Sequence, residues 1–470
     1  MVLNIIIDIV VVGLLVITAT TKGFERVLPL SAFLLMLFPV ESQIPLPGLF
    51  DLTTQRLIVI VLVALYFSMG RSQNHGGQKE KLPFRNLLIC LIVWMLLSSA
   101  VSVVPDVSLK STLSQLLDFI VPYYIYAKTV SKVETVNKIL FAFVAAMFVC
   151  SIFAYLEIYW DWSILSVFPR VGHRFGEAFG EVGDRGVRAQ ATFPVPILFG
   201  AALAMAIPLA LHLLTVFKAK GQRLFLWSAT MLMFLGIYKS GSRGPWLALA
   251  LSLAILLFLR RDAVRKYLGI ILVLTATVLI VRPGVWDTFA NLYHETRNPD
   301  SAQGASYEWR YALYRVAERE LSKDFGRAVW GYGPESFYYL GLTTQFFLDG
   351  EVRNVPVETC DSAVVEVLMD TGCVGFLLVA VFLLKSASAA FRNFRKLPSP
   401  ANSLFVVFFA NICAFCFLMT NVQIWGWGQQ NYLLWIGVAL MMIYPGLEHE
   451  GDAGQQRLEL IPMMVESPVY

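Results

Sequence analysis

Long apolar runs recur from one end of the chain to the other, and short polar segments separate them. Each run is roughly 15–23 residues long, which is the length that a helix needs to cross a hydrocarbon core of about 30 Å. The pattern therefore predicts an all-α polytopic membrane protein with about 12–13 transmembrane helices, because the shortest run also suits a re-entrant segment. The predicted spans are 2–19, 28–41, 56–70, 86–104, 112–127, 138–159, 192–214, 223–239, 245–260, 267–282, 362–384, 403–421 and 431–445.

Composition supports the membrane assignment. Of the 470 residues, 57% are hydrophobic and 15% are charged, and the mean hydropathy is +0.64. A soluble domain carries about 25% charged residues. Five of the six cysteines fall inside apolar runs, which favours a packing role over metal binding. The sequence predicts no metal, cofactor or nucleic-acid site, and its apolar start is predicted to be a first span instead of a cleaved signal peptide.

Basic residues orient the predicted helices, because cytoplasmic loops are enriched in lysine and arginine. The linkers after the third, seventh, ninth and eleventh spans carry clusters of such residues and fall on the same side of the membrane. Residues 160–191 and 283–361 are then expected on the opposite, external side. The predicted divisions are N-terminal helices at 1–159, central helices at 160–282, a large external loop at 283–361, C-terminal helices at 362–445 and a cytoplasmic tail at 446–470.

The large external loop is expected to contain short helices. Its segment Ser306–Ser322 has apolar residues at helical spacing, at Trp309, Leu313, Val316 and Leu321. This spacing predicts an amphipathic helix. The arginines and glutamates on the same segment are equally typical of a solvated, salt-bridged surface. A turn is expected at residues 331–334, which read GYGP.

One stretch places a charge at a membrane boundary. Residues 240–246 read SGSRGPW and lead directly into an apolar span, which puts Arg243 in the first turn of a predicted helix. Arginine at such a boundary is costly, so it indicates a functional site. Pro245 suits the first helical position. The unpaired N–H groups and positive dipole end of a helix start favour an anion such as phosphate.

Two other polar residues are expected at the external starts of helices that run in the same direction. Arg188 precedes the span at 192–214, and Asp361 precedes the span at 362–384. Together with Arg243 they predict an anion-attracting pocket in which a carboxylate acts as a general base. Simpler roles stay open, because arginines can anchor a membrane interface and aspartate can cap a helix.

Four motifs, in order along the chain, resemble elements of the O-antigen ligase and O-antigen polymerase family. Residues 188–196, RAQATFPVP, are similar to its Arg-x-x-x-Thr-Phe-x-x-Pro element. Residues 240–246, followed by an apolar span, look like its signature segment. Arg310 and the later sequence GYGPESF, at 331–337, resemble the Gly-x-Gly-x-x-x-Phe part of its large periplasmic loop. Residues 370–375, DTGCVG, resemble its Glu-x-Gly-x-x-Gly element.

The resemblance implies a metal-independent glycosyltransferase of the bacterial inner membrane whose active site faces the periplasm. Its donor would be a glycan on undecaprenyl pyrophosphate, and its acceptor would be a hydroxyl of a glycan or lipid. Arg188 and Arg243 would hold the leaving pyrophosphate, whose charge grows in the transition state. The residues expected to bind substrate are Arg185, Lys239, Arg310, Glu335 and Glu358.

The general base is where the chain departs from the family. Ligases of the family usually carry a histidine at the start of the span after the large loop, and the eleventh position before Gly372 is Asp361. The histidines expected on the external side, His173 and His294, lie elsewhere. Asp361 is therefore the predicted base, with Glu358 as the alternative. The missing histidine also makes transfer to lipid A core a poorer expectation than polymerisation or ligation to another acceptor.

A transporter of an anion or a lipid-linked sugar is the alternative function. Transporters favour broken helices and charges near the membrane midplane. Asp118 and Glu366 fall within predicted spans and fit that alternative. The three residues of the predicted pocket instead gather at one surface beside a large loop. The sequence therefore favours glycosyl transfer and leaves polymerase and ligase open.

Overall fold

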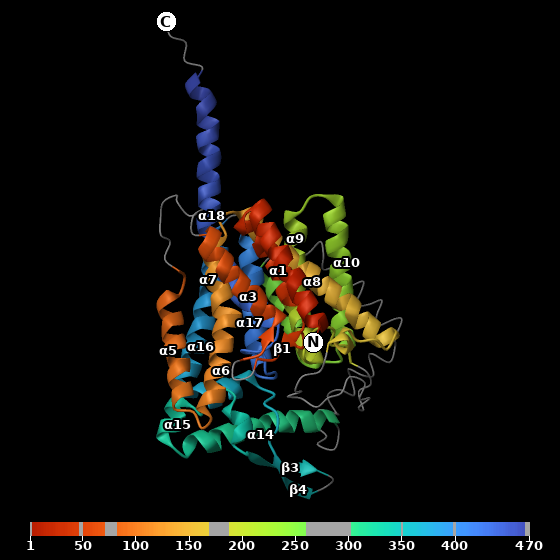
Figure 1. Ribbon diagram of the computed structural model, residues 1–470, viewed down its shortest axis with the longest axis vertical. Helices are drawn as coiled ribbons and strands as arrows, with labels where there is room; N and C mark the ends of the chain where they lie inside the picture. Colours follow the sequence, from red (N-terminus) through yellow and green to blue (C-terminus); the bar gives the residue numbers. More distant parts are fainter. Residues whose placement is uncertain are drawn as a thin grey trace.

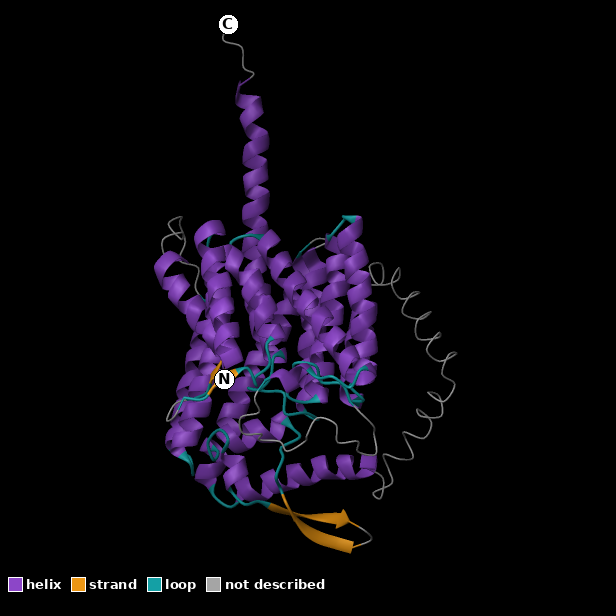
Figure 2. Ribbon diagram, turned by 45° about the vertical axis from the view of Figure 1, so that its right-hand side comes forward, coloured by secondary structure: helices purple, strands orange, loops and turns teal. Residues whose placement is uncertain are grey.

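The computed structural model describes residues 2–46, 50–70, 82–168, 188–259, 302–348, 351–397 and 401–465. Most of its helices stand side by side in a bundle, and a helical layer with a β-hairpin lies across one end (Figures 1 and 2). We call this end the α14 end, after its longest helix. The α-helices are α1 (Val2–Lys22), α2 (Val27–Leu37), α3 (Thr54–Leu65), α5 (Arg85–Ala100), α6 (Pro105–Gln115), α7 (Val121–Thr129), α8 (Val133–Tyr159), α9 (Pro196–Val216), α10 (Lys220–Lys239), α11 (Arg243–Leu259), α14 (Ala302–Ser322), α15 (Phe325–Trp330), α16 (Ala363–Lys396), α17 (Ala401–Met419) and α18 (Gln430–Val465). Antiparallel strands pair as β1 (Gln43–Ile44) with β2 (Leu52–Thr53) and β3 (Thr343–Leu348) with β4 (Glu351–Pro356).

The described helices have the length and composition of a membrane protein. Within the described ranges, α1, α8, α9, α16 and α17 are long and apolar enough to cross a membrane, and shorter apolar helices accompany them. The prediction of an all-α polytopic membrane protein is confirmed. Every predicted span overlaps a helix, except the span at 267–282, which lies outside the described residues. The total of 12 or 13 spans stays a prediction.

Helix α9 forms the centre of the bundle. In its most apolar window 94% of the residues are buried, compared with 28% for α1 at the periphery. Small residues let its neighbours approach closely. A Cβ added to Gly200 would lie 2.7 Å from Cγ of Pro245. The Pro245 side chain of α11 therefore packs directly on the backbone of α9. The starts of α9, α11 and α16 lie toward the α14 end, whereas α18 continues beyond the opposite end (Figure 1).

Helix α16 is broken near its start, and the break holds the loop that precedes it. Gly372 has φ 65° and ψ −174°, so the backbone leaves the helical path there. The carbonyls released by the break accept hydrogen bonds from the loop: Tyr332 N donates to Met369 O at 2.7 Å, and Gly333 N donates to Asp370 O at 2.9 Å. The two motifs at 331–337 and 370–375 therefore interlock through their backbones.

Glycine is needed on both sides of this contact. A Cβ on Gly331 would lie 2.5 Å from the carbonyl oxygen of Asp370, and a Cβ on Gly372 would lie 2.2 Å from that of Val329. Both glycines also have positive φ, which other residues adopt only at a cost. Nearby, the rings of Trp94 and Trp330 stack with their centroids 4.3 Å apart. The contact is thus a close backbone approach covered by aromatic side chains.

A small second core joins the loop at 302–361 to α16. Leu313 and Val316 of α14 are buried against Val365 and Met369 of α16. This confirms the amphipathic helix predicted at 306–322, and it sets the apolar face toward the membrane helices. The hairpin β3–β4 is absent from the sequence prediction, although Asp349-Gly350 between its strands is a strong hairpin signal.

Candidate functional site

Arg188 lies against the turn that opens α11. Its Nε donates to the carbonyl of Ser240 at 3.0 Å, and its Nη2 donates to Oγ of Ser242 at 2.6 Å. The backbone reinforces this contact, because Ala189 N donates to the carbonyl of Lys239 at 3.0 Å. Two motifs that are about 50 residues apart in the sequence therefore form one structural unit.

Arg243 is the first residue of α11, and Pro245 is the third. The expectation that Pro245 occupies the first helical position is wrong by two residues. Gly241 has φ 60°, which completes the turn early enough for the helix to begin at Arg243. Proline is tolerated at the third position because the first N–H groups of a helix have no intrahelical acceptor. Arg243 is half-buried at this helix start.

Asp361 immediately precedes the cap of α16. Ser362 is the N-cap residue, and its Oγ accepts from Val365 N at 3.5 Å. The alternative that Asp361 serves as the cap is therefore wrong, because the hydroxyl of the next residue takes that position. Asp361 is half-buried. Its neighbour Ala363 donates its N–H to the carbonyl of Val422 at 2.9 Å, which ties this helix start to the end of α17.

Arg310, on α14, also contacts the residues that follow α17. Its Nε donates to the carbonyl of Asn421 at 3.0 Å, one residue before Val422. At the same helix end, a Cβ on Gly244 would lie 3.6 Å from Cδ2 of Leu418. The end of α17 and the residues after it therefore contact Arg310, the start of α16 and the start of α11.

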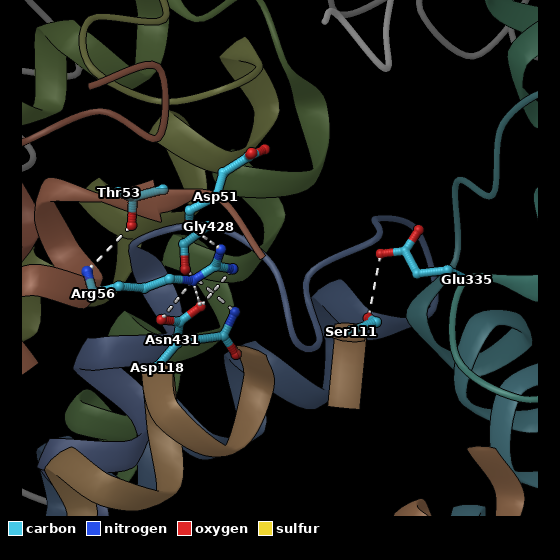
Figure 3. A network of polar contacts seen from close by, with 8 residues as sticks. All are labelled: Asp51, Thr53, Arg56, Ser111, Asp118, Glu335, Gly428 and Asn431. Atoms are coloured by element: carbon cyan, nitrogen blue, oxygen red, sulfur yellow. Dashed lines mark hydrogen bonds and ion pairs between the residues drawn. The ribbon is translucent and has the colours of Figure 1, made fainter. Parts of the chain in front are cut away.

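Carboxylates gather where the loop at 302–361 meets α16. Glu366 accepts from Nε2 of Gln423 at 2.7 Å, and the hydroxyl of Tyr338 donates to Oε1 of the same glutamine at 3.2 Å. Burial raises the pKa of Tyr338, and the nearby carboxylates add to the effect, so its hydroxyl stays protonated and acts as a donor. Glu335 accepts from the hydroxyl of Ser111 at 3.4 Å (Figure 3). Glu335 thus contacts α6, and its role in substrate binding stays a prediction.

The remaining predicted residues differ in their settings. The ammonium of Lys239 lies over the rings of Tyr159 and Tyr238, 5.0 and 5.7 Å from their centroids. Aromatic rings attract a cation through their negative faces. Glu358 is exposed on the loop before α16. Arg185 lies outside the described residues. The carbonyl of Lys239 accepts from the N–H of the residue after Arg188, so these two segments are in contact. Glu358 lies three residues before Asp361 in the sequence.

An ion pair between α3 and the π-helical turn at Leu116–Ile120 was not predicted. Nη2 of Arg56 lies 3.1 Å from Oδ2 of Asp118, and Nε contacts both carboxylate oxygens at 3.2 Å (Figure 3). Both side chains are mostly buried, with 17% and 16% exposed. The sequence shows Asp118 as a charge within a predicted span. Its partner, Arg56, is 62 residues away in the sequence. Pairing at that separation leaves no local sequence signal.

Residues 228–380 match the family model for O-antigen ligase. The matched range begins in α10, contains Arg243, Arg310 and Asp361, and ends in α16 beyond its break. This match confirms the resemblance to the O-antigen ligase and polymerase family. The chain therefore carries an O-antigen ligase-like segment, set in a multi-pass membrane bundle. Comparison with curated proteins gives no match.

Proposed function

We propose that this O-antigen ligase-like membrane protein transfers a glycan from undecaprenyl pyrophosphate to an acceptor hydroxyl at the periplasmic face of the bacterial inner membrane. The observation that carries the proposal is the contact of Arg188 with the Ser240–Ser242 turn. That contact brings one arginine against the helix start that bears Arg243. Two guanidinium groups at a helix N-terminus are suited to a pyrophosphate, because both the donors and the dipole favour negative charge.

In the proposed reaction, the acceptor oxygen bonds to the anomeric carbon of the donor sugar. The bond from that carbon to the pyrophosphate oxygen breaks, and the lipid pyrophosphate leaves with the electron pair. Arg188 and Arg243 stabilise the growing negative charge on the leaving group. A base takes the proton of the attacking hydroxyl. Side chains supply these functions, and the proposed mechanism needs no metal ion.

Asp361 is the proposed base, and Glu358 is the alternative. The support for Asp361 is its position, since it lies beside the start of α16 and Ser362 performs the capping. An Asp361→Asn variant should lose transfer yet still bind the lipid-linked donor. Retained turnover would move the role to Glu358 or to a group on the substrate.

The match to the ligase family favours transfer over transport, and the broken helix does not reverse this. Discontinuous helices in transporters present released carbonyls to a substrate or ion. In α16 the carbonyls of Met369 and Asp370 already accept from the loop backbone. The break at Gly372 therefore serves loop docking. Substrate flux in proteoliposomes without any acceptor would support the transporter instead.

Arg243→Ala should reduce glycan transfer by at least about a hundredfold, because removing a group that stabilises transition-state charge typically costs 10²–10³ in rate. The assay is transfer from lipid-linked donor in membranes with matched protein levels. Arg223→Ala, at the exposed opposite end of α10, is the control and should transfer normally. A fully active Arg243→Ala protein would contradict the proposal.

Gel analysis of surface glycans after gene deletion separates the two forms of the proposed reaction. Loss of long chains with single repeat units retained indicates a polymerase. Accumulation of polymer on the lipid carrier indicates a ligase.

A further inference from the structure

A buried glutamate lies behind the segment that carries Arg188. Glu157, near the end of α8, is only 1% exposed. Its Oε2 accepts two backbone hydrogen bonds, from Gln190 N at 2.9 Å and from Ala191 N at 2.8 Å. Its Oε1 accepts from the hydroxyl of Ser163 at 2.9 Å. Both carboxylate oxygens are thus committed to protein donors.

The backbone at this point has an unusual shape. Ala191 has φ 53°, in the left-handed region that costs non-glycine residues free energy. Successive N–H groups near a left-handed residue can converge to form a concavity that binds an anion. Here the two N–H groups converge on the carboxylate of Glu157. The carboxyl group of Glu157 therefore supplies the acceptor for two N–H groups whose backbone conformation is neither helical nor part of a sheet.

The held segment leads directly to Arg188. Ala189 and Ala191 are fully buried, and Ala189 N donates to the carbonyl of Lys239. Two residues after the contact with Glu157, Phe193 N closes a turn on the carbonyl of Gln190 at 2.9 Å. The position of the Arg188 guanidinium on the α11 turn thus depends on a backbone segment that is held by hydrogen bonds to Glu157.

We infer that Glu157 is a positioning residue, which fixes the backbone of Gln190 and Ala191 and so holds Arg188 on the Ser240–Ser242 turn. This inference rests on the proposed function for its effect on transfer. Its structural part, the fastening of the segment, does not depend on that function. The two parts can therefore fail separately.

The contact pattern makes the choice of variants informative. In Glu157→Gln, the amide oxygen can occupy the place of Oε2 and accept both N–H groups, while Ser163 turns its hydroxyl to accept from the amide NH₂. Glu157→Asp keeps the charge but withdraws the oxygens by one methylene. Glu157→Ala leaves two buried N–H groups unpaired, which is costly. If Glu157 acts through hydrogen-bond geometry, the glutamine variant should behave more like the wild type than the aspartate variant does. If its charge is required, the aspartate variant should behave more like the wild type.

The experiment has one readout that is independent of activity. Trypsin cleaves after Arg188 only when this segment opens, and mass spectrometry detects the peptide that begins at Ala189. We expect Glu157→Ala and Glu157→Asp to raise the rate of this cleavage by at least about tenfold, because a lost hydrogen bond to a charged group costs about 1.5–3 kcal/mol. Glu157→Gln should raise the cleavage rate less than either of these variants, because its amide oxygen still accepts both N–H groups, although through weaker neutral hydrogen bonds.

Glycan transfer should follow the same order. The kcat of Glu157→Ala and Glu157→Asp should fall by at least about tenfold, while Glu157→Gln restores it, since tenfold corresponds to 1.4 kcal/mol. The control is Glu134→Ala, at the other end of the same helix, where the side chain is 73% exposed and pairs with Lys138. This control should match the wild type in both assays.

The outcomes separate the two parts of the inference. Unchanged cleavage and unchanged transfer in Glu157→Ala would overturn it. Glu157→Asp with wild-type behaviour and Glu157→Gln without would also overturn it, because charge would then be the requirement. If cleavage follows the expected order while the wild-type protein transfers no glycan, the fastening is supported and the proposed function fails. If Glu157→Ala does not fold, the order of the glutamine and aspartate variants decides.

Discussion

Arg188 illustrates how much of the site depends on single residues. Its guanidinium donates to the carbonyl of Ser240 and the hydroxyl of Ser242, so the side chain belongs to the α10–α11 turn as much as to its own segment. A planar guanidinium held at two points has a fixed orientation, which suits the proposed contact with a pyrophosphate. Gly241 lies between these two contacts and makes them possible.

Gly241→Ala should therefore impair the site without removing a charged group, because the added methyl would press on the Arg188 side chain. The residue has φ 60°, and a Cβ would lie 3.1 Å from Cγ and 3.3 Å from Nε of Arg188. The left-handed conformation alone costs a non-glycine residue about 1–2 kcal/mol. We expect glycan transfer to fall by at least about tenfold, measured as kcat at matched protein levels.

The matched control for this substitution is Gly221→Ala, at the start of α10, where a Cβ would meet nothing within 4 Å. This control should transfer normally. Equal activity of the two variants would show that the turn does not hold Arg188 in a productive position.

The functional arginines could be predicted from the sequence, whereas their supports could not, and Arg188 lies before the first residue of α9, Pro196, instead of at a helix start. Arg188 and Arg243 are visible because an arginine beside an apolar run is costly and rare. Glu157 accepts from Gln190, 33 positions away, and Arg56 pairs with Asp118, 62 positions away. Glu157 also follows a long apolar run, where it is indistinguishable from an interfacial acid. Such pairings depend on tertiary packing, which a single sequence does not reveal.

Among the elements, the contact between the loop at 302–361 and the break in α16 holds the candidate site together. The GYGP turn inserts its N–H groups into the break at Gly372, and α14 packs its apolar face on the first turn of the same helix. The loop is thereby fixed over the region where Asp361 and Arg310 lie. Both motifs could be found in the sequence. Their contact could not, since neither motif carries a signal for its partner.

Gly372→Ala should release the loop from α16. Its Cβ would lie 2.2 Å from the carbonyl oxygen of Val329, and φ is 65°. Strain of this kind costs about 1–3 kcal/mol, and overpacking adds a similar amount. We expect faster proteolysis within residues 302–361 and a loss of glycan transfer, while the membrane helices stay inserted.

Limited proteolysis with gel analysis measures this release, and Gly13→Ala on α1 provides the control because a Cβ there meets nothing within 4 Å. Protease resistance equal to the wild type would contradict the role given to the break.

At the scale of the whole molecule, the bundle brings distant parts of the chain to one end. α9 packs at the centre, α11 and α16 begin toward the α14 end, and the buried pair of Arg56 and Asp118 joins α3 to the segment between α6 and α7. The fold class and most helix positions followed from hydropathy, because membrane helices must satisfy their backbone internally. The hairpin β3–β4 and the break in α16 depend on short local signals and on tertiary contacts instead.

The central claim is that the arginine pair promotes departure of a lipid pyrophosphate during glycan transfer. Purified protein in liposomes, supplied with undecaprenyl-pyrophosphate-linked glycan and an acceptor glycan, tests this claim most directly. Both the elongated product and the released lipid pyrophosphate are measured. We expect one lipid pyrophosphate to be released for each glycosidic bond formed, and both products to be lost in Arg188→Ala. Transfer at the wild-type rate by Arg188→Ala, or movement of donor across the bilayer without bond formation, would show that the arginines do not have this role.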